Sequence, residues 1–233
     1  MRAYRATAGI GLIGLMLAAC GGEKPPATTS DLEQAVVDEV VKQTGRAPST
    51  DTTPCEILDD EFVRAHFAID TGVEITRSPS KYSPHPLCTV SWPKPNAAEI
   101  QKESAAAMSE YMVKKARGEN VEMPSFRTTD EVTLTIYEPV HDTPENAMTT
   151  FDAAMKLLSE GITRSHEDVE VTFQSDLTPV DGIGDKAMWA EKMRQISVVD
   201  GLQIYHVTVN TGAEPGTELE KAKAIAKDIA GEI

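Results

Sequence analysis

The amino-acid sequence predicts an α+β fold in which helices pack on one face of an antiparallel sheet. Two patterns indicate this class. Segments with apolar residues at helical spacing are interspersed with short segments in which apolar and polar residues alternate, and the last strands follow one another through tight turns such as Asp200-Gly201. Strands joined by such turns are antiparallel, and amphipathic helices bury their apolar side against a sheet. The 233 residues, 40% of them hydrophobic and 25% charged, suffice for one globular domain.

The first 22 residues have the pattern of an export signal. Two arginines precede the uncharged residues 6–22, a segment shorter than the roughly 20 residues that a membrane-spanning helix needs. The segment contains Leu17-Ala18-Ala19-Cys20, which resembles the lipobox of bacterial lipoproteins. The resemblance implies removal of residues 1–19 and acylation of Cys20, and two or more acyl chains hold a protein stably on a membrane. The alternative is an ordinary secretory signal with a chance cysteine.

The residue after the cysteine bears on which membrane would hold the chain. Gly21 rather than Asp follows Cys20, and in envelopes like those of enterobacteria the lipoprotein pattern then implies sorting to the outer membrane. We therefore expect a lipid-anchored protein of the cell envelope that faces the periplasm, in the outer rather than the cytoplasmic membrane.

Residues 20–54 are predicted to form a flexible tether that contains a short amphipathic helix. Gly, Pro, Ser and Thr are frequent on both sides of this helix and leave little to bury. Ser30 and Glu33 have the spacing of a capping box, and the helix is expected to end near Gly45. It either docks on the domain or acts as a partner-binding arm, and we expect docking.

Cys55 is expected to begin the compact domain, residues 55–233, and to form a disulfide with Cys88. The two are the cysteines that remain once Cys20 is acylated, and an even pair in an exported protein indicates a disulfide. Closing this loop stabilises the fold by roughly 3–4 kcal/mol in the chain-entropy model. A metal site calls for more Cys or His nearby, and a redox pair calls for C-x-x-C spacing.

Helices and strands follow in order along this domain. Asp59 caps a short helix over residues 60–67, and residues 87–92 alternate as a strand that ends before Pro93. A long helix opens at Asn96 and closes at Gly118, with Lys and Arg in its last turns, where the helix dipole favours cations. We expect its apolar residues to face the core, namely Ile100, Met108, Tyr111 and Met112.

The second half of the domain is predicted as a strand, a helix and then a β-meander closed by a helix. The strand covers residues 131–137, and Thr143 with Pro144 starts the helix, which continues to Gly161. The meander strands are expected at residues 169–173, 187–190, 195–199 and 202–210. Thr217 and Glu220 have capping-box spacing and start the last helix. Its apolar side comprises Leu219, Ala222, Ile225, Ala226 and Ile229.

A second resemblance covers most of residues 55–233. The segment Pro179 to Trp189 followed by a hairpin and an Ala/Lys-rich helix, together with Cys55-Glu56-Ile57-Leu58 and with Cys88 ahead of Trp92, is similar to uncharacterised small bacterial lipoproteins with a PsbP-like α/β fold. This resemblance rests on short motifs. It implies binding of a ligand or partner rather than catalysis, and it supplies no catalytic residue. The residues themselves predict a turn with positive φ at Gly182 and Gly184.

The sequence contains no motif of a catalytic, metal or cofactor site. The strings G-x-S-x-G, H-E-x-x-H and G-x-x-x-x-G-K-[ST] are absent. One G-x-G-x-x-G string occurs at residues 9–14, but it follows no strand and lies in the signal segment. We therefore expect no enzyme activity, no metal and no cofactor.

Three side chains are candidates for a ligand or partner surface. Trp92 and Trp189 lie at the ends of predicted strands, where they either line a cleft or belong to the core, and His206 lies on a strand beside Tyr205. The net charge of −15 excludes a nucleic-acid partner on electrostatic grounds and favours a basic protein partner.

The leading hypothesis is a lipid-anchored cell-envelope protein whose non-catalytic α+β domain binds a protein partner or supports envelope assembly. A narrower form of it is an immunity or inhibitor-type protein that meets a basic partner. The alternative is a small-molecule-binding lipoprotein with a pocket between the sheet and the helices.

Overall fold

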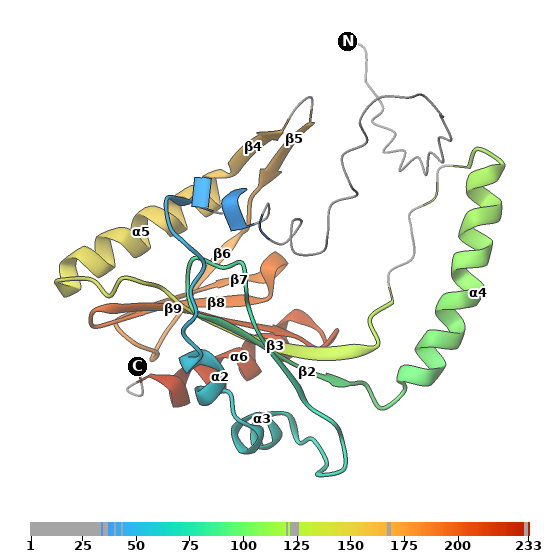
Figure 1. Cartoon of the computed structure of the whole chain (residues 1–233), viewed down its shortest axis with the longest axis horizontal. Helices are drawn as coiled ribbons and strands as arrows, with labels where there is room; N and C mark the ends of the chain where they lie inside the picture. The colour runs from blue at the N-terminus through green and yellow to red at the C-terminus, as the bar shows by residue number, and fades with distance from the viewer. Residues whose placement is uncertain are drawn as a thin grey trace, which may run out of the picture.

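A seven-stranded antiparallel sheet is the centre of the computed structural model (Figure 1), which describes residues 34, 37–39, 41–42, 44–119, 121, 126–166, 169–230 and 233. Within this part of the chain the spatial order of the strands is β1-β2-β3-β9-β8-β7-β6. Their bounds are β1 Thr76–Pro79, β2 Leu87–Pro93, β3 Thr129–Ile136, β6 Leu177–Val180, β7 Lys186–Ala190, β8 Gln195–Asp200 and β9 Gln203–Asn210. The predicted α+β class and antiparallel sheet are confirmed.

Alternation along the strands decides which side chains enter the main core. In β3, Val132 and Leu134 are fully buried, whereas Thr133 between them is half-buried on the other face. The register places Val132 between Val90 of β2 and Val209 of β9, so the buried residues form rows across the sheet. One face of the sheet is therefore apolar over most of its width.

Helices α2 Thr53–Ile57, α3 Asp60–Phe67 and α6 Pro215–Ile229 cover this apolar face (Figure 1). The inner side of α6 is fully buried, and the Tyr205 hydroxyl donates a hydrogen bond to the Ala226 carbonyl at 2.9 Å. A disulfide joins Cys55 of α2 to Cys88 of β2, as the cysteine count predicts. This bond ties the first helix of the domain to the sheet.

Helix α5, Pro144–Glu160, packs on the opposite face of the sheet. Its buried residues Phe151 and Met155 meet Val199 of β8 and Ile204 of β9, whose neighbours in sequence face α6. The helices thus cover more than the single face that the sequence predicts. The reason is that β8 and β9 each have consecutive apolar residues, so both sides of these strands are buried.

Several short elements are not predicted by the sequence. These are α2, the edge strands β1 and β6, and strand β4, Ile162–His166, which pairs with β5, Val169–Phe173, in a hairpin that protrudes beyond α5 (Figure 1). Strand β1 is polar and mostly exposed, and β6 contains Pro179, which a strand tolerates at an edge. Neither strand has the alternation that identifies a half-buried strand.

Residues 46–51, predicted as tether, lie against the domain. The Ser49 N–H donates to the Ser83 carbonyl at 2.8 Å, and α2 begins at Thr53, ahead of the expected domain start at Cys55. We call residues 46–51 the strap. Cys20, the capping pair of the tether helix and the signal segment lie outside the described residues.

Of the predicted helix caps in the described residues, those at Asp59 and Thr143 are confirmed, whereas the Asn96 side chain makes no capping hydrogen bond. Asp59 accepts the Phe62 N–H at 2.8 Å, and Thr143 accepts the Asn146 N–H at 3.2 Å. The capping box at Thr217 is wrong, because α6 begins earlier, with Pro215 at its first position and no side-chain cap.

Glu218, in the first turn of α6, is buried and forms an ion pair with the partly buried Arg194. It is 1% exposed, accepts the Thr211 N–H at 2.7 Å and lies 3.2 Å from the Arg194 Nε. Arg194 occupies the turn between β7 and β8 with φ at 54°. The pair therefore fastens the start of α6 to the sheet.

The turn before β7 contains the two predicted glycines with positive φ, 76° at Gly182 and 53° at Gly184. The two differ in surroundings. A Cβ at Gly184 would lie 2.6 Å from the Val199 carbonyl oxygen, whereas a Cβ at Gly182 would meet no atom within 4 Å. Only Gly184 is required by close packing as well as by its backbone conformation.

Candidate functional site

Helix α4, Ala97–Ala116, stands apart from the rest of the domain (Figure 1). In the sequence, α4 follows β2 and precedes β3. These two strands are adjacent and antiparallel in the sheet, so a short turn could connect them. The predicted ends of this helix are confirmed, but none of its residues is buried. The expectation that its apolar side faces the core is therefore wrong.

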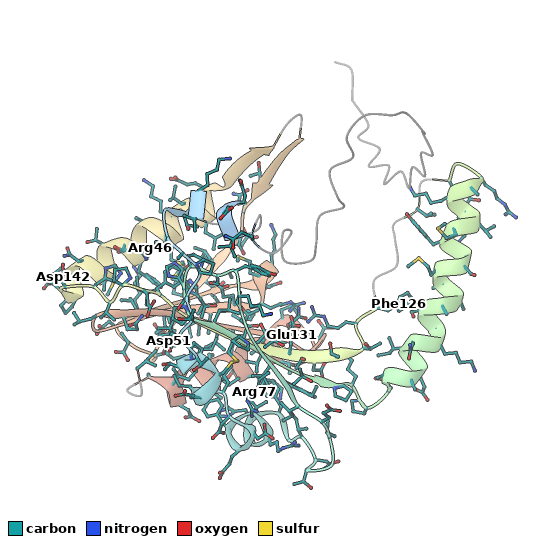
Figure 2. All side chains as sticks on the ribbon, viewed as in Figure 1. Arg46, Asp51, Arg77, Phe126, Glu131 and Asp142 are labelled. Atoms are coloured by element: carbon teal, nitrogen blue, oxygen red, sulfur yellow. A yellow bond between two sulfur atoms is a disulfide. The ribbon has the colours of Figure 1, made fainter. Side chains whose placement is uncertain are left out.

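The most exposed apolar side chains of α4 lie near its C-terminal end. Met112 is 61% exposed and Val113 50% exposed, and Phe126, on the segment that returns to β3, is 37% exposed (Figure 2). The acids and bases of α4 balance, with Glu99, Glu103 and Glu110 against Lys102, Lys114 and Lys115. In proteins most of the stability of a helix comes from packing of an apolar side. Within the described residues, α4 thus has no fully buried side chain.

The two predicted tryptophans lie elsewhere, in the main core. Trp92 is 6% exposed and Trp189 is 3% exposed. The Trp92 ring contacts the ring of Phe67 of α3, with centroids 4.6 Å apart. This corrects the assignment of both residues to a ligand or partner surface, because helices cover the face of the sheet to which they point.

His206 is on the opposite face of the sheet, in a stack of three rings. It meets the Tyr137 ring edge-on with centroids 4.7 Å apart, and Tyr137 stacks on His85 at 4.3 Å. We call these three residues the His–Tyr column. The Nδ1 atom of His206 is buried and has no hydrogen-bond partner. Of the three candidate surface residues that the sequence suggests, only His206 takes part in this arrangement.

The surroundings of the column favour uncharged rings. Burial, assisted by the neighbouring His85, lowers the pKa of His206 to about 4. Burial and the positive charge of Arg46 lower the pKa of His85 below its usual value, and burial raises the pKa of Tyr137. At neutral pH the column is therefore uncharged.

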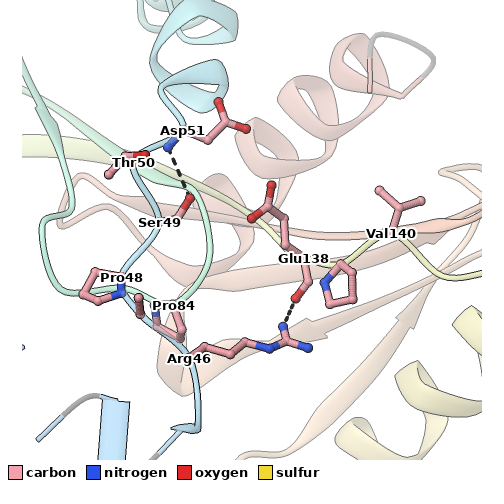
Figure 3. Close-up of a pocket in the computed structure, with 10 residues that line it drawn as sticks. Arg46, Pro48, Ser49, Thr50, Asp51, Pro84, Glu138 and Val140 are labelled. Atoms are coloured by element: carbon pink, nitrogen blue, oxygen red, sulfur yellow. Dashed lines mark hydrogen bonds between the residues drawn. The ribbon is translucent and has the colours of Figure 1, made fainter. Parts of the chain in front are cut away.

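A cleft of about 710 Å³ opens beside the column, between the strap with Pro84 on one side and residues 138–140 on the other (Figure 3). The Arg46 guanidinium spans it and donates to the Glu138 carbonyl, while the Glu138 N–H donates to the His85 Nδ1 at 3.1 Å. In Figure 3 the Arg46 guanidinium lies in the lower part of the view, and the carboxylates of Asp51 and Glu138 lie above it.

A smaller groove of about 510 Å³ lies between α5 and strands β6 and β7. Met155 and Met188 contribute apolar surface to it, and Lys156 and Lys186 contribute charge. Lys186 is engaged with Asp152 at 2.7 Å. The groove can hold a small, partly apolar molecule.

Within the described ranges, no three His, Cys, Asp or Glu side chains are grouped to hold a metal ion. The hydrogen bonds and ion pairs of the described histidine rings lead to the Phe62 carbonyl, the Asp228 carboxylate and the Glu138 amide, and none of these partners is a Ser, Thr or Cys side chain. No helix in the described part of the chain has the length and apolar character to cross a bilayer.

Sequence reasoning missed Arg46, His85 and Tyr137. They meet through contacts that span 53 residues, from His85 to Glu138, and 92 residues, from Arg46 to Glu138. The one local signal is that prolines flank His85 on both sides. In comparisons with known proteins, no family model, no curated protein and no solved structure matches this chain.

Proposed function

We propose that this chain is a lipid-anchored protein of the cell envelope whose α+β domain has no catalytic role and binds a protein partner through helix α4. The observation that carries the proposal is the exposure of α4, with Met112 at 61% and Val113 at 50%. Most helices in proteins gain their stability by burying an apolar side. A partner that packs on α4 would supply this burial.

The chemistry of the partner follows from the charges. The chain carries a net charge of −15, whereas α4 itself has balanced charges. Long-range attraction would bring a basic protein to the domain, and apolar contacts with α4 would then hold it. Such a partner suits a role in envelope assembly, or an immunity or inhibitor-type role, at the periplasmic side of the outer membrane.

Site-directed cross-linking in the intact envelope tests this proposal. A photo-reactive residue at Met112 is expected to capture one basic protein, and addition of salt before irradiation should lower the yield. The matched control is the same residue at Leu157, which is 55% exposed on α5. Equal capture from Leu157, or no capture from Met112, contradicts a binding role for α4.

A pair of charge variants separates binding from folding. Met112→Glu with Val113→Glu should abolish co-purification of the captured protein and change the free energy of unfolding by no more than about 0.5 kcal/mol, because neither residue is packed. Leu157→Glu is the control and should leave co-purification intact. Unaltered co-purification by the double variant would count against the proposal.

The lipid anchor has its own test. Replacement of the acylated residue, Cys20→Ala, is expected to give an unprocessed precursor without lipid label in cells fed a labelled fatty acid. Cys88→Ala is a control that leaves processing intact. Normal processing and labelling of Cys20→Ala would refute the anchor.

A small-molecule-binding role is the second candidate, and the groove between α5 and strands β6 and β7 favours it. The groove is open and has apolar surface from Met155 and Met188. Met188→Trp would fill it, and loss of a ligand found by mass spectrometry of the purified protein would support this role. Retention of that ligand by the filled groove would refute it.

A further inference from the structure

Three segments far apart in sequence are fastened to one another at Glu138. Its N–H donates to the His85 Nδ1 at 3.1 Å, and its carbonyl accepts from the Arg46 guanidinium. The strap is also bound to the loop before β2 through the Ser49 N–H and the Ser83 carbonyl, at 2.8 Å. The strap, the loop before β2 that contains His85, and the loop after β3 therefore form one connected unit, and Figure 3 shows the bond between Arg46 and Glu138.

The bond to His85 exists only while that ring is neutral. Nδ1 accepts a hydrogen from Glu138, so the ring proton of the neutral form is on Nε2. Protonation places a hydrogen on Nδ1, and two donors then face each other. Protonation also adds a positive charge beside Arg46, the residue that fastens the strap to the loop after β3.

We propose that His85 is a proton-sensitive latch that holds the strap against the loop after β3 while neutral and releases it when protonated. Release opens the cleft. It also frees the strap, which at about 3.3 Å per residue adds roughly 20 Å of reach between the domain and whatever precedes it. The latch is independent of the role proposed for α4.

The charged and titratable groups around His85 favour release in acid. The strap contributes Arg46 and Asp51, the loop after β3 contributes Tyr137 and Glu138, and β9 contributes His206. The Asp51 carboxylate is held by the Thr53 N–H at 2.8 Å and the Thr53 hydroxyl at 2.7 Å. That carboxylate therefore already has partners at the start of α2, whereas the Arg46 charge acts on the ring directly.

Amide exchange measured by NMR on the disulfide-bonded chain tests the latch. Between pH 7.5 and pH 5.5, after correction for intrinsic rates, the protection of the Glu138 and Ser49 amides is expected to fall by about tenfold, the effect of losing one hydrogen bond and its support. Amides of β8 and β9 should show the same pH response in the unmodified chain and in a His85→Asn variant, because their exchange does not depend on the latch.

His85→Asn keeps a hydrogen-bond acceptor near the Nδ1 position and cannot titrate in this range. This variant should hold the protection of both amides within about twofold across the same pH interval. The matched control is His141→Asn, which removes a half-buried histidine from the loop after β3 and should respond as the unmodified chain does.

A second variant keeps the proposal falsifiable if His85→Asn loosens the loop at all pH values. Arg46→Gln removes the charge beside the ring, so the NMR titration midpoint of His85 should move to higher pH. An unmoved midpoint overturns the latch, as does pH-independent protection of Glu138 and Ser49 in the unmodified chain. Equal loss of protection at Glu138 and Ser49 in His85→Asn and in the unmodified chain would also overturn it, because the pH response would then come from the whole domain.

Discussion

Lowering the pH from 7.5 to 4 should destabilise the domain through His206. Its Nδ1 is buried without a hydrogen-bond partner, and burial lowers its pKa from the ordinary 6.5 to about 4. The folded state therefore binds the proton less readily than the unfolded state. The free energy of unfolding has its full value above pH 6.5 and decreases as the pH falls below 6.5. The decrease is complete near pH 4.

The size of this effect follows from the two pKa values. One pKa unit corresponds to about 1.4 kcal/mol, so a difference of about 2.5 units is worth about 3 kcal/mol. This is an upper value, because the residue as a whole is half-buried and water reaches part of it.

Denaturant unfolding followed by tryptophan fluorescence measures the effect, since Trp92 and Trp189 are both in the core. His206→Gln lowers stability at every pH through lost ring contacts, but it removes the titration. We therefore expect the decrease in unfolding free energy between pH 7 and pH 4 to be smaller in His206→Gln by up to about 3 kcal/mol. The carboxylates are present in both proteins, so their contribution to the pH dependence cancels in the comparison. If the unfolding free energies of the two proteins decreased in parallel between pH 7 and pH 4, the reasoning would be refuted.

Three further predictions concern stability and use the same denaturation assay at pH 7.5. Glu218→Gln should lose about 3 kcal/mol, because it leaves the partly buried Arg194 without its counter-charge; a loss below about 1 kcal/mol would contradict a role for the pair. Gly184→Ala should destabilise by at least about 2 kcal/mol more than Gly182→Ala, since only the former meets a carbonyl oxygen, and equal losses would contradict the packing argument. Reduction of the disulfide should cost about 3–4 kcal/mol in the chain-entropy model, and an unchanged denaturation midpoint would exclude this contribution.

The parts of the fold that sequence predicts are those with local causes. Asp59 and Thr143 cap helices because their side chains reach an amide within the next turn. The strands that alternate most clearly are present close to their predicted bounds, and the hairpin turn at Asp200-Gly201 is present with φ at 56° on the glycine. The short elements β1 and β6 lack such local signals because they lie at the edges of the sheet.

The candidate surfaces depended far more on tertiary structure. The apolar spacing of α4 is that of a packed helix, and no local feature reveals that none of its residues is buried. The tryptophans illustrate the same limit. Their positions on strands are compatible with a cleft or a core, and the placement of α3 and α6 over that face decides for the core.

The sequence by itself determined the helix and strand periods, the disulfide pairing and the excess of acid, because each depends on residue type and short spacing. The tertiary structure alone decided that α5 lies on the second face, that α4 is exposed, and that His85, Tyr137 and His206 form a column beside the strap. The physical reason is that a period reports which side of an element is apolar, whereas the partner of that side comes from residues distant in the chain. The latch at His85 arises in this way, from contacts that span 53 and 92 residues.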